Sequence, residues 1–132
     1  MKILFVCRAN VGRSQAAMAF YNLKHPGKAD SAGTLVDVPG EQLKQRGGAA
    51  NIISVMNGYG VDMSEYMRRQ IDEVVADGYD KIIVMAEPET IPKWLLTNDK
   101  TVLWAVSDPK GQSVERTREI AAGIKARVDS LD

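Results

Sequence analysis

The chain has 132 residues, the length of one domain, and we expect residues 1–132 to form a single domain. Its 17 basic and 17 acidic residues cancel, which argues against a nucleic-acid or membrane-surface binder, because such proteins carry a basic excess. Its single cysteine, Cys7, excludes a disulfide within the chain, and no signal sequence or membrane-spanning apolar run is visible. These features predict a cytoplasmic protein.

The first half of the chain begins with the apolar run of residues 3–6, which indicates a buried strand. Residues 14–24 carry an apolar stripe at helical spacing, and residues 29–34 form a short second strand. Residues 35–45 are typical of a loop, and residues 49–56 indicate a second helix.

The second half of the chain continues the alternation. We expect a short helix at residues 70–76, a strand at 81–85, a short helix at 88–96, a strand at 101–106 and an amphipathic helix at 113–131. Apolar strands separated by helices predict an α/β fold with a parallel sheet covered on both faces. Ligands of such sheets bind beyond the carboxyl ends of the strands, where Cys7 and Asp108 both stand.

The segment from Cys7 to Ser14 connects the first strand to the first helix and carries the strongest signal for chemistry. Such a loop can turn its backbone N–H groups inward and, with the helix N-terminus, bind an anion. Arg13 offers a planar pair of donors to two anion oxygens, and the same positive field favours the thiolate form of Cys7. Asn10 suits a left-handed backbone position, and Gly12 permits close approach of the backbone.

Asp108 is the candidate general acid. A thiolate that attacks a phosphate ester needs a proton donor for the departing oxygen, and Asp108 follows the fourth strand at the same edge of the sheet as Cys7. Pro109 stiffens the loop that carries it.

These residues resemble the low-molecular-weight protein tyrosine phosphatase superfamily, which includes arsenate reductases of the same fold. The resemblance covers nearly the whole chain and rests on the loop with Cys7, Asn10, Arg13 and Ser14, together with further blocks at residues 31–34, 60–64 and 69–70 and at Asp108-Pro109. It implies a three-layer sandwich around a four-stranded parallel sheet in the order 2-1-3-4. In the family, the residue matched by Ser31 hydrogen-bonds the loop asparagine and supports the loop.

The resemblance also implies a reaction without a metal or cofactor, in which Cys7 forms a phosphocysteine and Asp108 serves first as acid and then as base. We therefore expect a phosphatase for phosphate monoesters, including protein phosphotyrosine. Cys7, Arg13 and Asp108 are the predicted catalytic residues. The predicted substrate-binding residues are Arg8, Ala9, Asn10, Val11, Gly12 and Ser14.

Two departures from the family pattern keep alternatives open. No aromatic residue follows residues 31–34 or Asp108-Pro109, which leaves Tyr66 and Trp104 as candidates for an aromatic wall or for packing. Gln15 is similar to the arsenate reductases, and because Cys7 has no partner cysteine, a reductase would need an external low-molecular-weight thiol. A non-catalytic oxyanion-binding module is the third hypothesis. We expect Arg68 and Arg69 to lie on a solvated face.

Overall fold

The computed structural model describes residues 1–131. Four parallel strands form one sheet in the order β2-β1-β3-β4, which confirms the predicted fold class and strand order. The strands are β1 (Ile3–Cys7), β2 (Ala29–Gly33), β3 (Lys81–Val84) and β4 (Thr101–Leu103). The α-helices are α1 (Arg13–Lys24), α2 (Ala50–Asn57), α3 (Glu73–Asp77), α4 (Lys93–Leu96) and α5 (Val114–Asp129). Three short 3-10 turns lie at Leu43–Gln45, Gly47–Ala49 and Pro88–Thr90.

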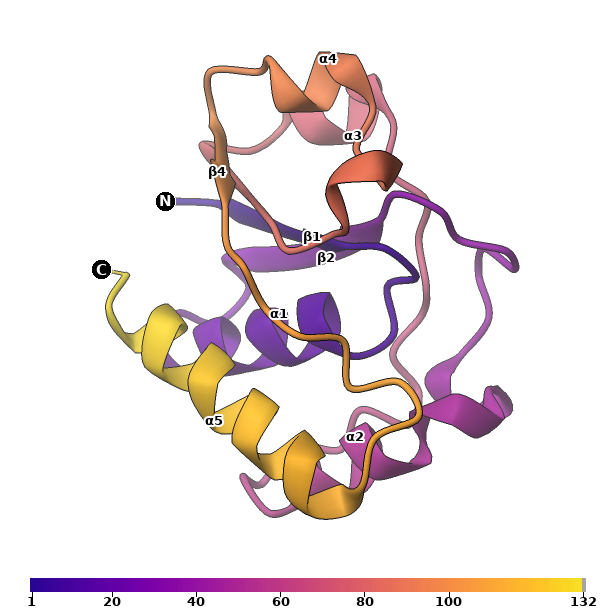
Figure 1. Cartoon of the computed structure of the whole chain (residues 1–132). Helices are drawn as coiled ribbons and strands as arrows, with labels where there is room; N and C mark the ends of the chain where they lie inside the picture. The colour runs from indigo at the N-terminus through magenta and orange to yellow at the C-terminus, as the bar shows by residue number, and fades with distance from the viewer. Residues whose placement is uncertain (132) are drawn as a thin grey trace.

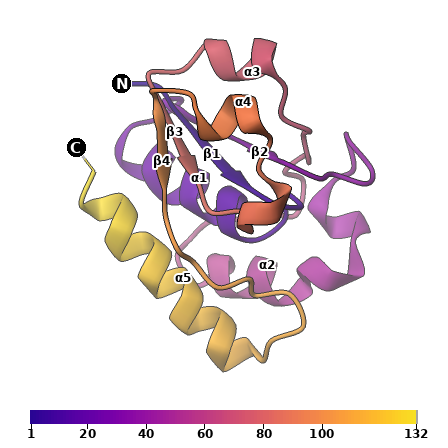
Figure 2. The ribbon, with the colours of Figure 1, turned by 45° about the horizontal axis from the view of Figure 1, so that its top comes forward.

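Helices cover both faces of the sheet, with α1, α2 and α5 on one side and α3 and α4 on the other (Figures 1 and 2). Strand β1 lies inside the sheet and is buried along its whole length. Its side chains alternate, so that Ile3 and Phe5 pack toward α1 and α5, while Leu4 and Val6 pack toward α3 and α4. The continuous apolar run in the sequence follows from this burial on both faces.

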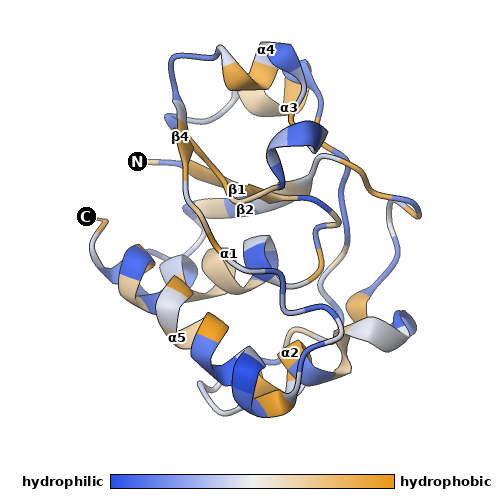
Figure 3. Cartoon of the chain, viewed as in Figure 1, coloured by the Kyte–Doolittle hydropathy of each residue, from blue (hydrophilic) through white to orange (hydrophobic). Residues whose placement is uncertain are grey.

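Helix α5 lies in the same layer as α1 and α2, and hydrophobic and hydrophilic residues alternate along its length (Figure 3). Ser113 caps it by accepting a hydrogen bond from the Arg116 amide at 3.0 Å. Ile120, Ile124 and Val128 are buried against the core, as their spacing in the sequence predicts.

Three predicted elements differ from the structure by three residues or more, or are divided, whereas the bounds of the others agree within two residues. The strand expected at 101–106 ends at Leu103, because the Trp104 amide bonds the carbonyl of Val84 at 2.9 Å and β3 ends there, leaving later residues no partner in the sheet. The helix expected at 88–96 is divided at Pro92, whose extended backbone separates a 3-10 turn from α4. Helix α3 begins at Glu73, because Asp72 caps it.

The carboxyl ends of β1 and β3 and the chain beyond β4 meet at one edge of the sheet. In the register, Cys7 at the end of β1 pairs with Gly33 at the end of β2, and Val6 pairs with Val84 at the end of β3. The loops that leave this edge carry the candidate site.

Candidate active site

Residues 8–12 form the loop between β1 and α1. Asn10 adopts a left-handed conformation, with a φ of 56°, and turns the chain sharply. The backbone N–H groups of residues 8–12 donate no hydrogen bond to residues 1–131. These donors, together with the N-terminus of α1, are therefore available to a bound anion.

The sulfur of Cys7 is buried beside this loop, with 2% of the residue exposed. It lies 3.1 Å from the Ser14 hydroxyl oxygen, and that oxygen accepts a hydrogen bond from the Asn10 amide at 2.8 Å. An amide nitrogen can only donate, so the single hydroxyl proton of Ser14 is free to point at the sulfur. The Asn10–Ser14 pair therefore favours Cys7 as an acceptor, which is the role of a thiolate.

Asn10 joins the loop to the structure behind it. Its side-chain nitrogen donates to the Ser31 hydroxyl at 3.0 Å, the contact that the family resemblance implies, and its side-chain oxygen accepts from the Arg69 amide at 2.7 Å. Adding a Cβ at Gly33 would bring it within 2.6 Å of the Arg8 carbonyl and 2.9 Å of the Asn10 amide. The end of β2 therefore packs directly against the loop, and only glycine fits there.

Gln15 is a second loop support, which the sequence analysis treated only as a departure from the family pattern. Its side chain is fully buried, donates to the Asn10 carbonyl at 3.2 Å and the Met67 carbonyl at 3.0 Å, and accepts from the Ser31 hydroxyl at 3.0 Å. Buried amides need such partners because an unpaired polar group is costly. Gln15 thus fixes the backbone of the loop from below.

Arg68 corrects a sequence interpretation. It is 1% exposed, whereas Arg69 beside it is exposed as expected. The Arg68 guanidinium donates from Nε and Nη2 to the Ala9 carbonyl at 3.0 and 2.9 Å. Its charge is balanced by Glu41 and Asp37, each at 2.8 Å, and the hydrogen bond from Arg68 lowers the pKa of Asp37. Arg68 therefore holds the Ala9 carbonyl of the loop with two hydrogen bonds.

Arg13 enters the site from the first turn of α1 and is 2% exposed. Its Nη1 donates to the Met85 carbonyl at 2.6 Å and to Glu87 at 2.8 Å, and its Nη2 donates to the other Glu87 oxygen at 3.1 Å. This paired geometry fixes the guanidinium plane. Although burial alone would lower the pKa of Arg13, the hydrogen bond to Glu87 and the charges of Cys7 and Asp108 raise it. The guanidinium is therefore always charged.

Glu87 is a site residue that the sequence analysis missed. It lies at the carboxyl edge of β3, and this position was the only signal in the sequence. The hydrogen bond from Arg13 lowers the pKa of Glu87, so its carboxylate is ionised at neutral pH.

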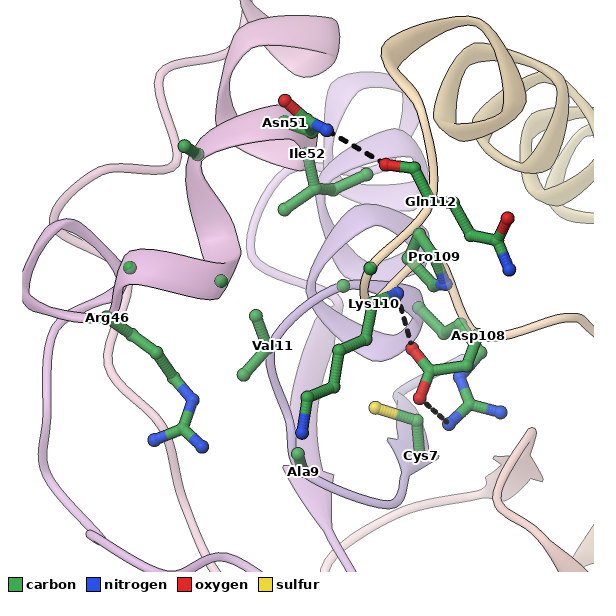
Figure 4. Close-up of a pocket in the computed structure, with 16 residues that line it drawn as sticks. Cys7, Ala9, Val11, Arg46, Asn51, Ile52, Asp108, Pro109, Lys110 and Gln112 are labelled. Carbon is green, nitrogen blue, oxygen red and sulfur yellow. Dashed lines mark hydrogen bonds and ion pairs between the residues drawn. The ribbon is translucent and has the colours of Figure 1, made fainter.

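Asp108 faces Cys7 across the site (Figure 4). One carboxylate oxygen lies 3.6 Å from Nη2 of Arg13, and the other accepts a hydrogen bond from the Lys110 amide at 2.9 Å. The side chain is 43% exposed, which gives it access to solvent protons. Pro109 is buried against the loop, and a Cβ at Gly12 would lie 2.7 Å from it. The loop that carries Asp108 therefore rests on the loop that follows Cys7.

A cleft of about 240 Å³ opens above the sulfur. Val11, Ile52 and Pro109 form its apolar wall, and Arg46, Asn51, Lys110 and Gln112 contribute polar groups. No aromatic side chain of residues 1–131 lines it. Tyr66 and Trp104 instead pack against the core, so the candidate aromatic wall is absent and their packing interpretation holds.

The cleft separates the predicted substrate-binding residues into two groups. Ala9, Val11 and Gly12 line it. Arg8, Asn10 and Ser14 do not: Arg8 is exposed outside it, and the other two are fully buried behind the loop. Asn10 and Ser14 therefore act on the loop and the sulfur, and can meet an anion only through backbone amides.

Among residues 1–131, no group of three or more histidine, cysteine or acidic side chains is placed to hold a metal ion. None of the helices formed by these residues has both the length and the apolar character that crossing a bilayer requires.

Comparisons with known proteins give one consistent result. The family model described as "Low molecular weight phosphotyrosine protein phosphatase" matches residues 2–132. A "Glutaredoxin arsenate reductase" of Synechocystis sp. is 30% identical over 132 residues, covering 98% of this chain and 95% of the relative.

Solved structures agree with this match. A low molecular weight protein tyrosine phosphatase from T. tengcongensis superimposes with a TM-score of 0.83 at 25% identity, covering 99% of this chain and 97% of the other. An arsenate reductase in a phosphate-binding state superimposes with a TM-score of 0.79 at 30% identity, covering 99% and 96%. The similar proteins therefore include both phosphatases and arsenate reductases.

Proposed function

Because the chain belongs to the low molecular weight phosphotyrosine protein phosphatase family, we propose that it is a cysteine-dependent phosphatase that hydrolyses phosphate monoesters. The observation that carries the proposal is the shared cleft. The Cys7 sulfur and the Asp108 carboxylate face each other in it, and the Arg13 guanidinium lies 3.6 Å from that carboxylate.

In the first step, the Cys7 thiolate attacks the phosphorus of the ester. A sulfur–phosphorus bond forms, the bond between phosphorus and the ester oxygen breaks, and Asp108 gives its proton to the departing oxygen. The loop amides and the free edge of the Arg13 guanidinium bind the three remaining phosphoryl oxygens, where charge gathers in the transition state.

In the second step, the Asp108 carboxylate takes a proton from a water molecule that attacks the phosphocysteine. The sulfur–phosphorus bond breaks, inorganic phosphate leaves, and the Cys7 thiolate is restored. The hydroxyl proton of Ser14 stabilises that thiolate as a leaving group. No metal or cofactor takes part in either step. A cytoplasmic location remains a prediction.

The test uses aryl phosphates with good and poor leaving groups. Cys7→Ser removes the nucleophile and is expected to lower kcat by at least about 10⁴-fold for every ester. Asp108→Asn is expected to slow esters with poor leaving groups by about 10²-fold or more and those with good leaving groups much less. Full activity of Cys7→Ser would exclude the mechanism, and equal slowing of all esters by Asp108→Asn would remove the acid role.

The substrate class is a separate part of the proposal. A phosphorylated protein and a small phosphate ester both fit the chemistry. The aliphatic cleft supports the small ester, because no ring lines the space where a phenyl group would stack.

A thiol-coupled arsenate reductase is the second candidate, and the relative named "Glutaredoxin arsenate reductase" favours it. Arsenate would join the Cys7 sulfur with loss of water, and an external thiol would attack that sulfur. Arsenite then leaves with the electron pair, and Cys7 remains as a mixed disulfide that a second thiol reduces. Arsenite production with glutathione or mycothiol tests this candidate, and no turnover with either would exclude it. Tight phosphate binding without turnover of any substrate would instead support the oxyanion-binding module.

A further inference from the structure

Two cationic side chains stand at the mouth of the cleft, and the proposed reaction uses neither. Lys110 follows Pro109 in the loop that carries the acid, whereas Arg46 lies between the 3-10 turns at Leu43–Gln45 and Gly47–Ala49. Figure 4 shows the Lys110 side chain extending over the opening, with its ammonium between Arg46 and Cys7. The two cations thus come from opposite walls and face the same space.

Their partners differ. Arg46 bonds Asp37 at 3.2 Å and Glu41 at 3.4 Å, and both carboxylates also bind Arg68, so two positive and two negative charges balance in that cluster. The ammonium of Lys110 forms no ion pair or hydrogen bond with any group in residues 1–131. Lys110 therefore contributes a positive charge at the mouth that no side chain of residues 1–131 pairs with directly.

The shape of the mouth leaves room for a ligand between these charges. Gly47 and Gly48 line the side next to Arg46 and have no side chains to fill it. Val11, Ile52 and Pro109 form the apolar wall below. An ester bound through its phosphate to the loop would lay its leaving group along this wall and carry the far end of that group to Lys110.

We propose that Lys110, with Arg46 opposite, forms a second anion site that selects small phosphate monoesters whose leaving group carries a further negative charge. The inference rests on the proposed phosphatase function and names its substrate class. A carboxylate and a second phosphate share the required chemistry, because either can accept hydrogen bonds from an ammonium.

The experiment compares three aryl esters: 4-carboxyphenyl phosphate, its carboxyl methyl ester, whose leaving group is uncharged, and 1,4-phenylene bisphosphate. The quantity measured is the ratio of kcat/KM for each charged ester to that for the methyl ester, in the parent and in each variant. Because the same ratio is compared between proteins, the different leaving-group reactivities cancel. Comparison of the two charged esters shows whether the site prefers a carboxylate or a second phosphate on the leaving group.

Lys110→Gln is expected to lower the ratio for at least one charged ester by about 3- to 5-fold, the effect of a solvent-exposed ion pair. Lys110→Arg keeps the charge and is expected to keep most of the ratio. Lys28→Gln is the matched control, because Lys28 is also exposed but lies at the opposite edge of the sheet, before β2. An unchanged ratio in Lys110→Gln, or an equal fall in Lys28→Gln, would overturn the inference.

Binding of the matching non-hydrolysable phosphonates, measured by calorimetry, separates this inference from the proposed function. If no ester is hydrolysed but the parent binds the carboxylated phosphonate more tightly and Lys110→Gln removes the difference, the phosphatase proposal fails and the anion site stands. If esters are hydrolysed without a charge preference, the phosphatase proposal stands and the anion site fails. If no ester is hydrolysed and neither phosphonate binds, both proposals fail.

Discussion

The bottom and the mouth of the cleft are built in different ways. Behind the sulfur, the side chains of Asn10, Ser14, Gln15 and Ser31, which we call the buried support, are almost fully enclosed and bond one another. At the mouth, Gly47, Gly48 and Lys110 are exposed, and the Lys110 ammonium forms no contact with a described polar group. Within residues 1–131, no buried side-chain nitrogen or oxygen lacks a hydrogen-bond partner.

This difference separates two requirements of the proposed reaction. Binding of the transferring group needs donors held in one geometry, and buried hydrogen bonds supply that because breaking one leaves a polar group unpaired. Selection of the leaving group needs only a few side chains at the mouth, which can change at little cost to folding because they are exposed. Substitutions in the two regions should therefore affect different measurements.

Arg13→Lys is the strongest way to test the first requirement. Lysine cannot keep two hydrogen bonds to Glu87 while presenting a flat edge to the anion, so kcat should fall by about 10²- to 10³-fold on an aryl phosphate. Arg116→Lys is the control, since Arg116 pairs only with exposed groups on α5 and its connection. If kcat falls by less than about tenfold, the paired geometry of Arg13 is not needed for the reaction.

Arg68→Met tests a second kind of loop support, at a residue that lies outside the buried support and does not line the cleft. The change leaves the Ala9 carbonyl without its guanidinium partner, so the free energy of unfolding should fall by about 1–3 kcal/mol. Because that carbonyl belongs to the anion-binding loop, kcat should fall by about tenfold through the misplaced donors.

Arg69→Met is the matched control for this variant. Arg69 is adjacent and exposed, and its side chain makes one hydrogen bond, to the Tyr79 hydroxyl at 3.1 Å. Urea unfolding and aryl phosphate kinetics should therefore show a much smaller loss. Equal losses in the two variants would contradict the assigned position of Arg68.

Glu87→Gln should have the smallest effect, and its stability effect depends on pH. The hydrogen bond from Arg13 lowers the pKa of Glu87 from its ordinary 4.5, so its ionised form is stabilised by folding. That stabilisation is fully present above pH 4.5 and is lost as the pH falls through the lower folded value. The difference in Tm between the parent and the variant should be largest near neutral pH and shrink below 4.5. A difference that grows on acidification would contradict this pairing.

The sequence predicted the fold where a local pattern was strong. The apolar run at residues 3–6 located β1, and the helical spacing of Ile120, Ile124 and Val128 located α5. The strand order came from the family resemblance, since periodicity does not specify which strands are neighbours. The division at Pro92 was missed, although a proline inside a predicted helix is a local signal.

The candidate site was predictable where its residues lie in one loop, where they follow the end of a predicted strand, or where the family resemblance names them. Cys7, Arg13 and Asp108 do meet at one cleft, and Asn10 does reach Ser31. Glu87 and Arg68 were missed because their partners lie 74 and 59 residues away, and no periodic pattern encodes such a pair. Two adjacent arginines suggest a solvated face, but in an extended segment neighbouring side chains point in opposite directions, and here one of them points inward.

The contact between Gly12 and Pro109 lets the loop that carries Asp108 approach the loop that follows Cys7 closely. No side chain separates the two loops, since even a methyl group at position 12 would lie 2.7 Å from the proline ring. Any displacement of the proline loop toward Cys7 must therefore move against the backbone that is proposed to bind the anion. The missing side chain of one residue thus lets the proposed acid and the proposed nucleophile lie on adjoining loops, and a larger residue there would push the loops apart without altering either side chain.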